Sequence, residues 1–230
     1  MKVAIVQFPG SNCDYDTLHV LRDVIKVDAD LVWHADLNET YDAVILPGGF
    51  SYGDYWRSGL VASFSPAIGV IKDMAKDGKN VLGICNGFQV LVEAKILPGA
   101  LLPNTSGTFI CKWVTVRVEN TNSALTRGME NGSVLRLPIA HAEGRYYLSE
   151  EDTKKLVENE QIVFRYSNIE GEITEESNPN GSILNIAGVM NPEGNIVGMM
   201  PHPERASERI LSPWGTEHGL RLLKNFVRRG

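Results

Sequence analysis

The chain has 230 residues, of which 43% are hydrophobic, and it carries a formal net charge of −6 at pH 7. This length and composition suit a single α/β domain with a buried core, and they exclude a disordered chain. The negative charge, without a basic cluster longer than Arg228 and Arg229, argues against nucleic-acid binding. No apolar run has the length of a signal peptide or a membrane span, so we expect a cytoplasmic protein without membrane contact.

Short apolar strands alternate with segments of helical period through the first half of the chain. Such alternation predicts an open, mostly parallel, doubly wound α/β sheet whose two faces are covered by helices. We expect strands at 3–7, 30–33, 43–46 and 80–84, and helices at 14–27, 62–76 and 88–94. Ligands of such sheets bind at the carboxyl ends of the strands, which here are followed by the loops 8–14 and 47–59 and by Cys85.

Strand follows strand in the second half. The pattern there predicts an antiparallel extension of the same sheet, with strands at 112–119, 133–138, 161–166, 183–189 and 195–200. Residues 167–181 are rich in Asn, Glu, Gly and Pro and predict an exposed loop, and a helix at 217–228 closes the chain. We therefore expect residues 1–230 to form one domain.

The sequence Gly-Ile-Cys-Asn-Gly at 83–87 follows an apolar run and precedes a helical segment. Glycine two residues either side of Cys85 suits a sharp strand-to-helix turn, since a Cβ there would collide where the backbone doubles back. The helix N-terminus behind the turn favours the thiolate form of Cys85. The pattern predicts a cysteine nucleophile elbow; a buried structural cysteine is the other interpretation that these five residues allow.

The three cysteines, Cys13, Cys85 and Cys111, form no C-x-x-C pair. An odd number without that spacing argues against a disulfide framework and against a zinc site, and it fits a reducing cytoplasm. We expect no metal on this chain.

A glycine-rich loop at 47–59 follows the expected strand at 43–46. It lacks both the Gly-Lys-Ser/Thr of a phosphate loop and the G-x-G-x-x-G spacing, so it does not predict nucleotide binding. Its Gly48-Gly49 pair can instead point a backbone N–H toward the elbow, where it would join the N–H of Asn86 in an oxyanion hole. A plain tight turn is the alternative.

A cysteine nucleophile needs a base and a group that orients the base. Two His-x-Glu segments follow expected strands, His202-Pro203-Glu204 and His141-Ala142-Glu143. The flanking prolines restrict the backbone and favour His202, but these residues alone leave both pairs open. The remaining histidines, at 19, 34 and 218, predict structural or exposed positions.

Together, the segments 47–50, 83–89 and 202–204 resemble the triad-type, class I glutamine amidotransferases. More narrowly, Gly-Gly-Phe-Ser-Tyr-Gly-Asp-Tyr at 48–55, Asn86 and the segment 109–114 resemble the glutaminase subunits of phosphoribosylformylglycinamidine synthases, which act in purine synthesis. The match runs from the first strand to the last helix. Trp56 departs from it, because members of the family more often have an aliphatic residue there.

The resemblance implies a catalytic triad. It makes Cys85 the nucleophile, His202 the base and then the acid, and Glu204 the residue that orients His202. His141 and Glu143 resemble a family segment outside the triad, so the resemblance decides between the two pairs.

The resemblance also implies the substrate contacts. Gly49 and Asn86 supply the oxyanion N–H groups, and Phe50, Gln89 and the backbone around Phe109 surround the glutamine. The ammonia passes to a separate synthetase subunit, which uses ATP and Mg to convert formylglycinamide ribonucleotide to formylglycinamidine ribonucleotide. A small bridging subunit accompanies the two. No cofactor is expected on this chain, which is too short to hold the ATP-using domain as well.

Three other functions remain open. One is a glutaminase subunit of another class I amidotransferase, against which Asn86 and the loop 50–55 argue. Another is a peptidase-like or stress-response protein of related fold, whose elbow cysteine works without His-Pro-Glu. The third is a binding or regulatory module in which Cys85 is inert.

Overall fold

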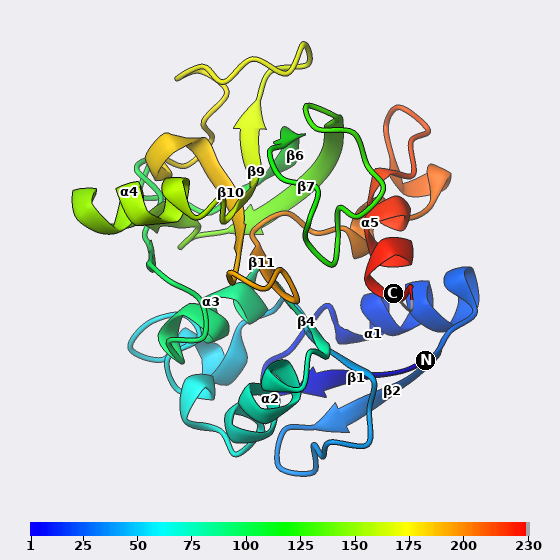
Figure 1. Ribbon diagram of the computed structural model, residues 1–230. Helices are drawn as coiled ribbons and strands as arrows, with labels where there is room; N and C mark the ends of the chain where they lie inside the picture. Colours follow the sequence, from blue (N-terminus) through cyan, green and yellow to red (C-terminus); the bar gives the residue numbers. More distant parts are fainter. Residues whose placement is uncertain (229–230) are drawn as a thin grey trace.

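The computed structural model describes residues 1–228. A mixed sheet runs through the molecule in the strand order β2-β1-β3-β4-β11-β10-β9-β6-β7 (Figure 1). Its parallel part comprises β2 (Asp28–Trp33), β1 (Lys2–Gln7), β3 (Ala43–Leu46), β4 (Asn80–Ile84) and β11 (Ile196–Met199). Its antiparallel part comprises β10 (Ile186–Met190), β9 (Ile162–Ser167), β6 (Ile110–Val118) and β7 (Val134–His141). The predicted fold class, a parallel α/β sheet with an antiparallel extension, is confirmed.

The position of β11 corrects one expectation. We expected the strand at 195–200 in the antiparallel extension, whereas β11 pairs in parallel with β4, with Met199 opposite Ile84. All four residues of β11 are buried. A continuous apolar run indicates a strand that is covered on both faces, but it does not tell the direction of the neighbouring strand. The late strand β11 therefore lies in the middle of the sheet, beside the strand that ends at Cys85.

Helices cover both faces of the sheet (Figure 1). The helices α1 (Asp14–His19) and α5 (His218–Phe226) lie on one side, and α2 (Ala67–Lys76) and α3 (Asn86–Glu93) lie on the other. Side chains of β1 and β3 that face these helices are fully buried, so the parallel strands form the centre of the core. Among the described residues, no helix combines the length and the apolar character that a membrane crossing requires.

Two predicted helices are interrupted. The expected helix at 14–27 consists of α1 and a wider π-helical segment, Val20–Ile25, which ends at Lys26 in a left-handed conformation (φ 65°). The expected helix at 62–76 starts as a 3₁₀ turn, Ala62–Phe64, and only α2 is α-helical. Pro66 explains this second break, because the residue before a proline is pushed out of the helical region, and Ser65 is extended there (ψ 147°).

Three elements were not predicted. The helix α4 (Glu150–Glu158) begins at Ser149, whose hydroxyl oxygen accepts the N–H of Asp152 at 3.1 Å, and it buries only Leu156. A helix with one buried side chain has no apolar stripe, so its period could not be seen. The strands β5 (Ala100–Leu102) and β8 (Arg145–Tyr147) pair with each other in a small separate sheet. They are too short for an alternating pattern.

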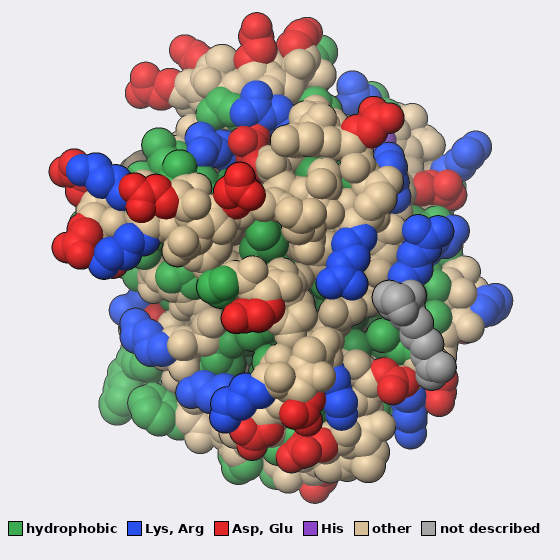
Figure 2. Space-filling model, in the orientation of Figure 1, with side chains coloured by type: hydrophobic (Ala, Val, Ile, Leu, Met, Phe, Trp, Pro, Cys, Tyr) green, Lys and Arg blue, Asp and Glu red, His purple; other side chains and the backbone are tan. Residues whose placement is uncertain are grey.

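One face of the molecule combines mixed charge with a hydrophobic area. On the face shown in Figure 2, basic and acidic side chains are interspersed, while hydrophobic side chains gather at the lower left, over the cyan segment of Figure 1. The exposed large side chains of that segment are Tyr55, Trp56 and Phe64.

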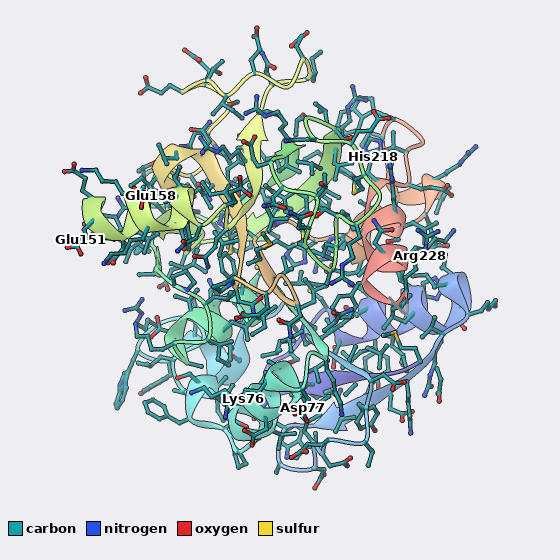
Figure 3. All side chains as sticks on the ribbon, viewed as in Figure 1. Lys76, Asp77, Glu151, Glu158, His218 and Arg228 are labelled. Atoms are coloured by element: carbon teal, nitrogen blue, oxygen red, sulfur yellow. The ribbon has the colours of Figure 1, made fainter. Side chains whose placement is uncertain are left out.

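His218, the first residue of α5, is half-buried, and its Nδ1 accepts the backbone N–H of Arg136 in β7 at 2.8 Å (Figure 3). As predicted, it is a structural residue.

Candidate active site

The backbone doubles back sharply at Cys85. The strand β4 ends at Ile84 and α3 begins at Asn86, so that Cys85 alone makes the turn, with φ 50° and ψ −105°. A Cβ on Gly87 would lie 2.0 Å from the carbonyl oxygen of Leu46, and one on Gly83 would lie 2.7 Å from the carbonyl group of Gly87. Only glycine fits at either place. The structure therefore contains the predicted elbow, with Cys85 held in a strained conformation at a helix N-terminus.

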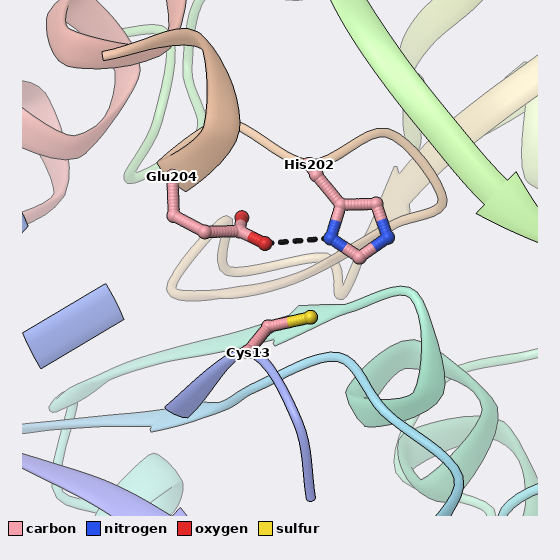
Figure 4. A group of neighbouring side chains, drawn as sticks. All are labelled: Cys13, His202 and Glu204. Carbon is pink, nitrogen blue, oxygen red and sulfur yellow. Dashed lines mark hydrogen bonds and ion pairs between the residues drawn. The ribbon is translucent and has the colours of Figure 1, made fainter. Parts of the chain in front are cut away.

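The neighbouring strand delivers a histidine and a carboxylate to the same place. The backbone N–H of Cys85 donates to the carbonyl oxygen of Met199, the last residue of β11, at 2.8 Å. Three residues later His202 follows, and its Nδ1 shares a 2.6 Å hydrogen bond with Oε1 of Glu204 (Figure 4). Both side chains are buried, at 2% and 1% exposure. The backbone N–H of His202 donates to the carbonyl oxygen of Pro138 at 2.9 Å.

The pKa of His202 lies well above its ordinary value. Burial by itself lowers this pKa, but the charges of Glu204 and of the Cys85 thiolate raise it, and contacts with the sulfurs of Cys13 and Cys85 act in the same direction. The arrangement therefore holds a proton on the imidazole of His202.

The second His-x-Glu segment is built differently. His141 is the last residue of β7, and its Nδ1 hydrogen-bonds to the side-chain oxygen of Asn104 at 3.0 Å. The Glu143 carboxylate accepts the backbone N–H of Ser58 at 3.2 Å. Burial and the charge of His202 lower the pKa of His141 to about 4, so it is neutral at pH 7. The segment thus lacks the imidazole–carboxylate pair that His202 and Glu204 form.

The low pKa of His141 predicts a pH-dependent stability. In unfolded chains histidine has a pKa of about 6.5, so between that value and about 4 the unfolded chain binds the proton that the folded chain excludes. This residue therefore makes folding less stable as the pH falls through that window. We expect His141→Gln to reduce the loss of unfolding free energy between pH 7 and pH 5, measured by urea titration at each pH. An unchanged loss would contradict the assignment.

The glycine-rich loop is fixed to the elbow by side-chain contacts. Asn86 accepts the backbone N–H of Ser51 at 3.2 Å through its side-chain oxygen. Gly49 has φ 146°, and a Cβ there would lie 2.6 Å from the backbone nitrogen of Asn12. Within residues 1–228 the Gly49 N–H makes no hydrogen bond, so it is available to a ligand. The loop thus lies next to Cys85, as an oxyanion loop requires.

The remaining predicted substrate residues lie around the same loop. The amide of Gln89 is engaged at both ends, because its Nε2 donates to the carbonyl oxygen of Glu143 at 2.7 Å and its Oε1 accepts from Asn86 at 3.0 Å. Phe50 and Phe109 are both about half exposed, and their ring centroids are 6.3 Å apart. The fold therefore brings together the two aromatic residues that the sequence placed 59 positions apart.

The structure adds one residue that the sequence did not assign to the site. Cys13, just before α1, is buried, and its Sγ accepts from Nη2 of Arg205 at 2.9 Å. Donor atoms of Cys13, His202 and Glu204 all lie within 4.8 Å of one another (Figure 4). The loop 8–14 was expected at the ligand-binding edge of the sheet, which was the available signal. No spacing rule, however, links Cys13 to residues so far along the chain.

Comparison with known proteins identifies the family. The family model of the CobB/CobQ-like glutamine amidotransferase domain matches residues 1–227. The phosphoribosylformylglycinamidine synthase subunit PurQ of Aquifex aeolicus is 58% identical, covering 96% of this chain and 97% of that protein. The subunit of the same name from Methanosarcina barkeri is 52% identical, covering 99% of this chain and 97% of its own length.

A solved structure agrees with these relatives. A chain in the structure of PurLQS from Thermotoga maritima superposes with a TM-score of 0.86 at 41% identity, covering 98% of this chain and 97% of that chain. The chain therefore belongs to the glutamine amidotransferase family and, within it, to the PurQ subunits of phosphoribosylformylglycinamidine synthase.

Proposed function

We propose that this chain, as one domain, releases ammonia from glutamine through a thioester at Cys85 and supplies it to the synthetase of the same complex. The observation that carries the proposal is the His202–Glu204 pair, joined at 2.6 Å and delivered by β11 beside the strained elbow. Assaying ammonia release from glutamine by the purified chain, with and without its synthetase partner, tests it.

The first half-reaction forms the thioester. The Cys85 thiolate attacks the carboxamide carbon of glutamine, and the resulting oxyanion accepts hydrogen bonds from the N–H groups of Gly49 and Asn86. His202 then gives its proton to the leaving nitrogen, so that ammonia departs and a γ-glutamyl thioester remains on Cys85. Glu204 holds the imidazole in position and stabilises its charged form.

The second half-reaction returns the enzyme to its starting state. The neutral imidazole of His202 takes a proton from water, which attacks the thioester carbon. The C–S bond breaks, glutamate leaves, and the thiolate–imidazolium pair is restored. The pair His141 and Glu143 takes no part in these steps, because Asn104 and Ser58 already bind their side chains.

The synthase needs further components beyond this chain. We assign ATP and Mg to the synthetase subunit, which would use the ammonia to convert formylglycinamide ribonucleotide, and we expect a small bridging subunit in the complex. Neither nucleic acid nor membrane is a partner in this proposal, and the complex acts in the cytoplasm. We also assign Phe50 and Phe109 to flank the bound glutamine; their half-exposed rings, 6.3 Å apart between centroids, support this assignment.

The loop after Phe50 suits control by the partner. Tyr52, Asp54 and Trp56 all have positive φ, at 54°, 54° and 68°, so the loop stores backbone strain. Tyr55 and Trp56 are 70% and 85% exposed. Exposed aromatic side chains on a strained segment are suited to a docking surface whose occupation changes the peptide at Gly49.

We therefore expect the free subunit to hydrolyse glutamine feebly and the complex to be more active. One correctly aimed oxyanion donor is worth about 3 kcal/mol, or about a hundredfold in rate. Trp56→Ala and Tyr55→Ala should blunt this rise in kcat, whereas Ile210→Ala, also highly exposed but outside the loop, should not. Equal kcat values for the free subunit and the complex would eliminate control by the partner.

A further inference from the structure

Cys13 is a buried sulfur that the glutaminase reaction does not use. It is 2% exposed and lies between the end of β1 and the start of α1. Its sulfur belongs to a group of three donors, one each from Cys13, His202 and Glu204, whose atoms all lie within 4.8 Å of one another. Figure 4 shows the Cys13 side chain directed toward the imidazole that Glu204 holds.

Two polar atoms of this group have no partner. Nε2 of His202 and Oε2 of Glu204 are buried and make no hydrogen bond with any part of the chain that the structure describes. Buried polar atoms are rarely left unpaired, so each such atom requires an explanation. The proposed reaction uses the imidazole of His202, but it leaves Oε2 of Glu204 and the Cys13 sulfur without a role.

We propose that Cys13, His202 and Glu204 form a binding site for Zn²⁺, and that the bound ion reversibly inhibits the glutaminase. A thiolate, an imidazole nitrogen and a carboxylate oxygen are the donor types that Zn²⁺ prefers, and water can complete a tetrahedral set. Tetrahedral bonds of about 2.0–2.3 Å put the donors about 3.3–3.8 Å apart. Donors of the group that lie as far apart as 4.8 Å therefore need to approach by about 1 Å, whereas Nδ1 of His202 and Oε1 of Glu204, at 2.6 Å, need to separate by about 0.7 Å. The inhibition, though not the binding, rests on the proposed function.

An ion can reach the group beside Arg205. A surface pocket of about 380 Å³ is lined by Asp16, Glu204, Arg205 and Glu208, among others, and its acidic side chains attract a cation. The guanidinium of Arg205 now occupies the cationic position at the Cys13 sulfur. Its side chain is 38% exposed and already lies 3.7 Å from Asp16, so it can leave the sulfur without being buried elsewhere.

Zn²⁺ bound at this site prevents His202 from acting as the base of the proposed reaction. Zn²⁺ binds the thiolate of Cys13 and neutral His202, so the thiol proton and the extra imidazolium proton are released to solvent and no electron is transferred. A neutral imidazole with a metal on one nitrogen keeps its proton on the other. Neither nitrogen can then accept a proton from water, whichever of them binds the ion.

Direct binding is measured without turnover, in a Cys85→Ala variant. Zn²⁺ titration by calorimetry is expected to give one site per chain, and Co²⁺ in its place is expected to give the absorption of a thiolate-to-cobalt charge transfer. Adding Cys13→Ser should weaken binding by more than about tenfold and remove that absorption, because a thiolate ligand is lost. Adding Cys111→Ser, the exposed cysteine, is the matched control and should change neither. Unchanged binding in the Cys13 variant, or no binding in Cys85→Ala alone, would overturn the proposal.

A second variant covers the case in which Cys13→Ser does not fold. Arg205→Gln keeps all three donors and removes the competing cation, so it should bind Zn²⁺ more tightly; equal or weaker binding contradicts the site. In the active complex, Zn²⁺ should inhibit glutamine-dependent synthesis, EDTA should restore it, and Cys13→Ser should be resistant. Equal inhibition of the Cys13 variant would overturn the inhibitory role. A chain that binds Zn²⁺ as described but lacks glutaminase activity would refute the proposed function and leave the metal site standing.

Discussion

Cys85→Ala is expected to abolish glutamine-dependent amidine synthesis by the assembled complex while synthesis from free ammonia continues. The thiolate takes part only in releasing ammonia, and alanine keeps the backbone of the elbow, whose shape depends on Gly83 and Gly87. Both activities are measured on the same preparation, with ammonium chloride replacing glutamine in one assay. Cys111→Ala, which changes an exposed sulfur, is the matched control and should leave both activities intact.

Loss of both activities in an intact complex would mean that Cys85 has a structural role. Covalent labelling gives an independent check. A glutamine analogue carrying a diazoketone should alkylate Cys85, and peptide mass mapping should locate the label there. Cys13 is the competing cysteine, since its sulfur lies in the same group as His202 and accepts a hydrogen bond from Arg205 at 2.9 Å. A label on Cys13 would contradict the assignment of the nucleophile.

His202→Ala is expected to lower glutamine hydrolysis by roughly 10²- to 10⁴-fold, the usual contribution of general acid–base catalysis. Of the two candidate histidines, His202 is the one that pairs with a buried carboxylate, at 2.6 Å, and its pKa is raised well above the ordinary value. His141→Ala should cost far less, because His141 is neutral, with its pKa near 4, and bonds to Asn104. The kcat of each variant in the complex is the measurement.

Equal losses in the two histidine variants would show that the wrong pair has been chosen. Glu204→Gln adds a finer test of the same site. It keeps a group that can hydrogen-bond to Nδ1 of His202 and removes the negative charge, so its loss of kcat should be smaller than that of His202→Ala. A larger loss would mean that the carboxylate does more than orient the imidazole.

The elbow could be predicted from the local sequence, because glycines two residues before and after Cys85 are typical of a sharp strand-to-helix turn. The position of the loop 47–59 also followed, since carboxyl ends of parallel strands share one edge of a sheet. The choice between His202 and His141 did not follow from the residues alone. What separates them is tertiary: Glu204 turns toward His202, whereas Glu143 accepts an N–H from Ser58, in a loop far away in sequence.

Other features depended on contacts that no local pattern encodes. The direction of β11 relative to β4 depends on how the chain returns into the middle of the sheet. A buried apolar strand has the same pattern whether its neighbour is parallel or antiparallel. The proximity of Cys13 to Arg205 joins residues 192 positions apart. The helix α4 was not predicted because it makes few contacts: only Leu156 is buried, so its sequence shows no helical repeat of apolar residues.

The hydrogen bond from the backbone N–H of Cys85 to the carbonyl oxygen of Met199 ties Cys85 and the strand that precedes His202 into the centre of the sheet. Amides in such a position become open to solvent exchange only when the whole sheet separates. We therefore expect the backbone N–H of Cys85 to be among the slowest of the described residues to exchange with solvent, whereas the loop 50–59 lies outside any strand. Two parts of the candidate site are thus anchored differently: Cys85 is bonded into the centre of the sheet, and the loop that we propose responds to a partner lies outside the strands.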